Sequence, residues 1–62
     1  MNKEIKLANI ALQILYDYRT IAELYIKETS EFAELDLESL ENWYEAKRKE
    51  IYKIVGWNYP ND

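Results

Sequence analysis

Hydrophobic residues recur at helical spacing in two segments of the chain, and the two segments differ in how much of the helix surface is apolar. Between Lys3 and Lys27 the apolar positions form one broad arc when successive residues are placed about 100° apart. No glycine or proline interrupts this stretch, which predicts a helix over residues 3–28. The arc is made of Leu7, Ala8, Ile10, Ala11, Leu12, Ile14, Leu15, Tyr18, Ile21, Ala22, Tyr25 and Ile26.

The second segment has a narrower apolar stripe and two legible ends. Asp36 is a good N-cap residue, and Leu35 and Leu40 have the spacing of a hydrophobic staple around it. Gly56 suits the left-handed position after a helix, with Trp57 following it. These signals predict a helix over residues 36–55, a connector over residues 29–35 and a short tail over residues 56–62.

The breadth of the first arc leads to an expectation about assembly. A helix that is apolar around most of its surface must be covered on more than one side, and the second helix covers only one. We therefore expect a single all-α domain over residues 1–62, an antiparallel helical hairpin that dimerises into a four-helix bundle. An alternative is a monomer in which the connector and tail form a third layer. The residues expected at the self-association contact are Ala8, Ala11, Leu15, Tyr18, Ala22 and Tyr25.

Antiparallel folding through the connector brings particular side chains of the two helices together. It places Asp17 beside Lys47 and Arg48, where we expect an ion pair. At the end of the second helix, Trp57 is expected to pack against Tyr52 and cover the helix end.

The composition removes most kinds of catalytic site. The chain has no histidine, no cysteine and a single glycine, which excludes Ser–His and Cys–His nucleophiles, most metal sites and phosphate-binding glycine loops. Glu41 and Glu45 are spaced for acid–base work, but acids at such positions are typical of a solvated face. We therefore expect no enzymatic activity, no bound metal and no cofactor.

Charge and hydropathy indicate which partners and which cellular location to expect. The formal net charge of −4 argues against a general nucleic-acid binder. No segment approaches the ~20 apolar residues of a membrane span, and the N-terminus lacks the features of a secretion signal. We expect a soluble, cytoplasmic protein without a membrane partner.

The acidic residues gather in the middle of the sequence. Between Glu23 and Ala46 there are eight acids, and Lys27 is the one base. This segment suits docking on a basic partner, as in inhibitors that imitate nucleic-acid phosphates, or simply solubility together with helix-dipole matching. Exposed aromatic residues add apolar area with a hydrogen-bonding tip. The candidate partner-binding residues are Glu31, Glu34, Glu38, Glu41, Tyr16, Tyr52, Trp57 and Tyr59.

These features favour a small non-catalytic protein-interaction module, a regulator or adaptor that acts by binding another protein. Two alternatives stay open. The first is an inhibitor or immunity-type protein whose acidic end blocks a basic enzyme or a nucleic-acid-binding site. The second is a purely structural homo-oligomerisation module.

Overall fold

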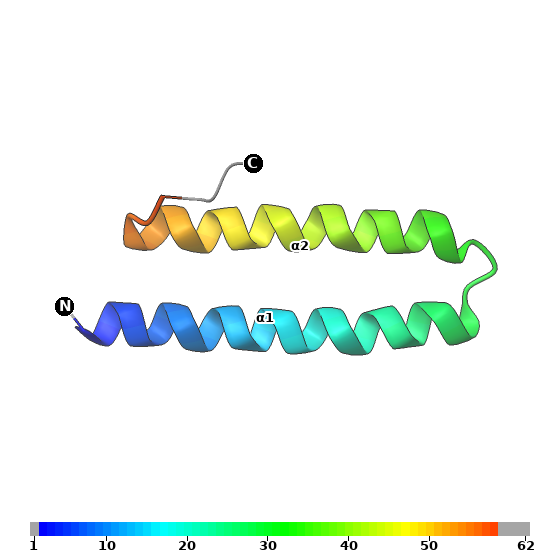
Figure 1. The fold of residues 1–62 in the computed structure, drawn as a ribbon, viewed down its shortest axis with the longest axis horizontal. Coiled ribbons are helices and arrows are strands. Elements are labelled where there is room, and N and C mark those ends of the chain that lie inside the picture. The colour runs from blue at the N-terminus through cyan, green and yellow to red at the C-terminus, as the bar shows by residue number, and fades with distance from the viewer. Residues whose placement is uncertain (1, 59–62) are drawn as a thin grey trace.

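The computed structural model describes the backbone of residues 2–58 and the side chains of residues 3–58, and it forms a hairpin of two helices (Figure 1). α1 spans Asn2–Thr29 and α2 spans Ala33–Val55. The helices lie side by side, with the turn at one end and the start of α1 and the end of α2 at the other. The prediction of an all-α antiparallel hairpin is confirmed.

The turn between the helices is shorter than the predicted connector, because α2 begins at Ala33. The hydroxyl oxygen of Ser30 accepts a hydrogen bond from the backbone N–H of Phe32 (3.1 Å), and the hydroxyl donates to the carboxylate of Asp36. Asp36 therefore lies inside the first turn of α2, and its predicted role as N-cap is wrong. Phe32 occupies the cap position, and its side chain makes no capping hydrogen bond.

The structure also corrects the ion pair expected between the helices. Asp17 lies on the outer side of α1, where it accepts a hydrogen bond from a side chain of α1 itself. The interhelical ion pair joins Arg19 to Glu41, with 2.8 Å between Nη2 and Oε1. Lys47 and Arg48 pair instead with acids of α2. The prediction was wrong because it assumed a longer connector, which sets a different register between the helices.

The end of α2 follows the prediction closely. Gly56 adopts a left-handed conformation (φ 78°), and its N–H bonds the carbonyl of Lys53 at 3.2 Å. The N–H of Trp57 bonds the carbonyl of Tyr52 at 2.9 Å, which completes a Schellman motif. The Trp57 ring packs edge-on against Tyr52, with 5.5 Å between ring centres. The predicted cover over the helix end is confirmed.

The interior between the helices is thin. Among the described residues only Ala8 is buried, at 5% exposed. The hairpin measures 45 × 22 × 14 Å, so its smallest dimension is little more than the ~10–12 Å diameter of one helix. Its radius of gyration is 13.7 Å, against about 10.6 Å for a compact domain of this length. One layer of two helices thus leaves both broad faces open.

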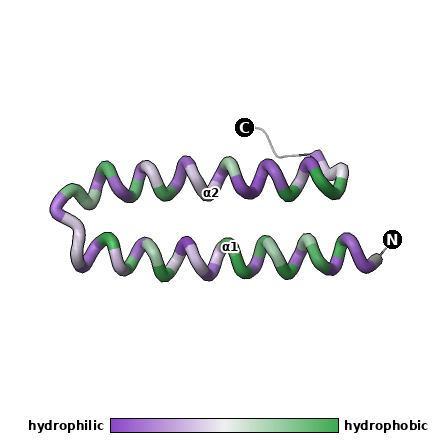
Figure 2. Tube along the Cα trace, turned by 180° about the vertical axis from the view of Figure 1, so that it is seen from behind, coloured by the Kyte–Doolittle hydropathy of each residue, from purple (hydrophilic) through white to green (hydrophobic). Residues whose placement is uncertain are grey.

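Hydrophobic and hydrophilic residues are interspersed along both helices (Figure 2). Over residues 2–58, neither helix contains an apolar stretch long enough to cross a membrane.

Candidate functional site

One broad face of the hairpin is lined by apolar side chains of both helices and is hollowed at three places along its length. We call it the groove face. The three hollows are an end hollow beside the start of α1, a middle hollow and a turn hollow. The positions on α1 recur every three or four residues and so share one side of that helix. The apolar residues that line the groove face are Leu7, Ala8, Ala11, Ile14, Leu15, Tyr18, Ala22, Tyr25 and Ile26 of α1, and Leu40, Trp43, Ile51, Ile54 and Val55 of α2.

Several of these side chains are large and exposed in the single hairpin. The exposed fraction is 63% for Ile14, 68% for Tyr25 and 82% for Ile54. Scattered exposed apolar residues are normal on a protein surface, but a contiguous set of them marks an interaction site. The groove face is such a set.

An aromatic pair crosses the centre of the groove face. The rings of Tyr18 and Trp43 are 5.4 Å apart between centres and tilted by 59°. Both residues line the middle hollow and the turn hollow, so the pair forms the ridge between them. Trp43 keeps 40% of its surface exposed although it packs against Tyr18. Large aromatic residues at the centre of a surface are typical of interface hot spots.

Polar side chains edge the groove face. Glu4 borders the end hollow, Lys47 and Glu50 border the middle hollow, and Asp36 and Ser39 border the turn hollow. An apolar centre with a polar rim is the usual anatomy of a protein–protein interface.

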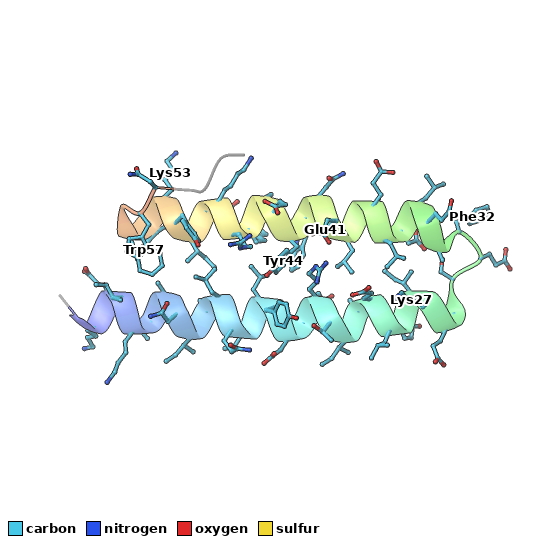
Figure 3. The ribbon with its side chains drawn as sticks, in the orientation of Figure 1. Lys27, Phe32, Glu41, Tyr44, Lys53 and Trp57 are labelled. Atoms are coloured by element: carbon cyan, nitrogen blue, oxygen red, sulfur yellow. The ribbon has the colours of Figure 1, made fainter. Side chains whose placement is uncertain are left out.

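Away from the groove face, the hairpin is held together by a row of charged and aromatic residues that line none of its hollows. Arg19 donates from Nε and Nη2 to Glu41 (3.0 and 2.8 Å), and its guanidinium lies 5.0 Å from the centre of the Tyr44 ring. Arg48 lies 5.7 Å from the ring centres of both Tyr44 and Tyr52. We call these five residues the arginine–tyrosine row. Glu41 and Tyr44 lie between the helices in Figure 3.

The electrostatics of this row keep Arg19 charged. The hydrogen bond with Glu41 raises the pKa of Arg19 above its ordinary value; burial opposes this rise, and the nearby carboxylates add to it. Because arginine is protonated at any working pH, Arg19 brings a positive charge to the contact with Glu41.

The structure places some of the predicted self-association residues between the two helices and the others on the groove face. Ala8 is buried against α2 and belongs mainly to the contact inside the hairpin. Leu15 is half-buried at the floor of the middle hollow. The other four residues, Ala11, Tyr18, Ala22 and Tyr25, line the groove face.

The predicted partner-binding acids are spread from the turn to the middle of α2. Glu31 and Glu34 are exposed beside Phe32, which is itself 66% exposed and labelled at the turn in Figure 3. Glu38 is exposed on α2, whereas Glu41 is engaged by Arg19.

The predicted aromatic residues do not form one surface. Tyr16 is half exposed on α1, and its carbonyl accepts a hydrogen bond from the Thr20 hydroxyl. Tyr52 and Trp57 pack together at the end of the hairpin remote from the turn (Figure 3). Tyr59 lies outside the described residues.

Sequence reasoning missed Arg19 and the part that α2 plays in the groove face. Arg19 follows Leu15 by four residues and precedes Ile26 by seven, so helical spacing alone places it on the side of α1 that faces α2. Trp43 and Ile54 belong to the apolar stripe that helical spacing predicts for the second helix, but the residues of α1 that lie beside them depend on the register between the helices.

Within residues 3–58, no cluster of three or more acidic, histidine or cysteine side chains is placed to hold a metal ion. No known protein family, characterised protein or solved structure matches this chain.

Proposed function

We propose that this chain is a small non-catalytic protein-interaction module, a regulator or adaptor that acts by binding another protein. The groove face is the observation that supports self-association, and the exposed turn residues Phe32 and Leu35 support the binding of another protein. The groove face is built by both helices, it has an apolar centre and a polar rim, and large residues such as Ile54 are exposed along it.

The groove face also supports assembly of two hairpins into a dimeric four-helix bundle. The chain exposes 5258 Å², whereas a compact folded monomer of 7.5 kDa exposes about 4,200 Å². The excess of about 1,000 Å² is close to the ~800 Å² that each partner buries in a standard interface. A second copy laid on the groove face would cover it and give each helix a neighbour on two sides.

The dimer is tested by sedimentation equilibrium of the full chain and two matched variants, Ile14→Lys and Leu24→Lys. Ile14 lines the middle hollow and is 63% exposed, while Leu24 is 58% exposed and lines none of the three hollows. Both side chains are open in the single hairpin, so neither change removes much packing within it. We expect the unchanged chain and the Leu24 variant to dimerise and the Ile14 variant to sediment as a folded monomer.

A monomeric unchanged chain would contradict the dimer, and equal dimerisation of the two variants would contradict the groove face as its interface. Circular dichroism at the same concentrations separates loss of dimer from loss of helix.

The turn is the surface that such a bundle leaves open for the other protein. Phe32 and Leu35 are 66% and 64% exposed there, each next in sequence to an exposed glutamate, Glu31 or Glu34. An apolar residue set among acids suits a partner with an apolar pocket and a basic rim. A photo-crosslinking residue in place of Phe32 should give a defined adduct in the producing cell, and the same residue in place of Leu24 should not. Equal labelling from both positions would contradict this assignment.

A further inference from the structure

We propose that the two copies in the dimer lie antiparallel, with the turn of each hairpin beside the open end of the other. The open end is the end where α1 begins and α2 finishes. This inference rests on the dimer proposed above and adds the orientation of the partner. A face-to-face dimer with two-fold symmetry has two choices, because the turns lie either at the same end of the bundle or at opposite ends.

The distribution of charge favours opposite ends. The turn half of the hairpin, residues 19–42, carries seven acidic side chains and two basic ones. The open half, residues 3–18 and 43–58, carries four acidic side chains and six basic ones. A dimer with both turns at one end would bring two acidic halves together, whereas the antiparallel dimer sets each acidic half beside a basic half. Electrostatic complementarity of this kind selects the orientation of a partner.

The sizes of the side chains on α1 favour the same arrangement. In the antiparallel dimer α1 lies against α1 of the partner, and a two-fold axis through the Tyr18–Trp43 ridge pairs positions whose numbers add to 36. Tyr25 then meets the partner's Ala11, and Ile14 meets the partner's Ala22. Large residues facing small ones allow two layers to interdigitate. The hollows around Ala11 and Ala22 are the places where the groove face has room for them.

The orientation is measured by pulsed electron–electron double resonance on the full chain. The chain has no cysteine, so Glu31→Cys, at the exposed turn, gives one spin label per copy. Glu31 lies 13 residues from Tyr18, which is about 20 Å along a helix at ~1.5 Å per residue. The antiparallel dimer therefore predicts about 40 Å between the two labels, and the parallel dimer predicts a distance set by the bundle width, about 25 Å or less.

A mixed sample supplies the matched control. Chains labelled at Glu31→Cys are combined with chains labelled at Lys3→Cys, a position at the opposite end of α1. The antiparallel dimer predicts a new short distance that appears only in the mixture, because the turn of one copy lies near the start of α1 in the other. A short distance in the Glu31→Cys sample alone would overturn the antiparallel arrangement while leaving the dimer intact. Absence of any distance between chains would overturn both.

Discussion

The two tryptophans of this chain provide a direct test of the groove face. Trp43 stands at its centre, packed on Tyr18 and 40% exposed. Trp57 lies beyond the end of α2, packed on Tyr52, and lines none of the hollows. Replacing each by alanine removes the same side chain from the two places, so we expect Trp43→Ala to weaken the dimer and Trp57→Ala to leave it unchanged.

The size of the effect follows from the area that Trp43 still exposes. An exposed fraction of 40% of a side chain that buries up to ~250 Å² is about 100 Å². At about 25 cal/mol per Å², covering this area contributes about 2.5 kcal/mol from each copy, hence about 5 kcal/mol to the dimer. With about 1.4 kcal/mol for each factor of ten, Trp43→Ala should raise the dissociation constant on the order of a thousandfold.

Sedimentation equilibrium over a wide concentration range measures this constant for the unchanged chain and for both variants. Each substitution also removes an aromatic contact inside the hairpin, worth about 0.5–1.5 kcal/mol. Thermal unfolding of the same samples, followed by circular dichroism, therefore measures the loss of hairpin stability separately from the loss of dimer. We expect the dissociation constant of Trp57→Ala to stay within about threefold of the unchanged chain. If the two variants dimerise equally well, Trp43 is not at the interface and the groove face is not the self-association surface.

Three further predictions concern the turn, the helix end and the effect of salt. Ser30→Ala removes both hydrogen bonds of the Ser30 hydroxyl and should lower the free energy of unfolding by about 1 kcal/mol, measured by denaturant titration. Gly56→Ala should also cost about 1–2 kcal/mol in that titration because φ is 78°, although nothing lies within 4 Å of the added methyl; no loss would contradict the left-handed cap. Raising the salt concentration from ~0.05 to ~0.5 M should weaken an antiparallel dimer several-fold, and a dimer that strengthens would indicate the parallel arrangement.

The fold was predictable from the sequence where the signals are local. α1 follows from an uninterrupted run of helix-forming residues, and the end of α2 follows from Gly56 and Trp57. The start of α2 was not predicted, although Asp36 is a good cap. Ala33, Glu34 and Leu35 are all good helix formers, so α2 begins at Ala33, three residues before Asp36. Ser30 then binds the Asp36 carboxylate that would have capped the later start.

Contacts between the helices were less predictable because they depend on the length of the turn. A turn of three residues in place of seven shifts the register, so that Glu41 meets Arg19 and the expected pair with Asp17 does not form. The groove face shows the same limit. Periodicity along α1 identified Ala11, Tyr18, Ala22 and Tyr25, but it could not place Trp43 and Ile54 of α2 beside them.

The difference between the two broad faces leads us to expect that the proposed assembly stops at two copies. The arginine–tyrosine row holds paired charges away from the groove face, so a third hairpin would have to desolvate Arg19 and Glu41 to pack there. A layer with only one apolar face closes as a dimer, whereas a layer with two can continue to stack. Arg19→Leu combined with Glu41→Leu should therefore produce species larger than a dimer in size-exclusion chromatography with light scattering. A double variant that remains strictly dimeric would show that the row does not limit assembly.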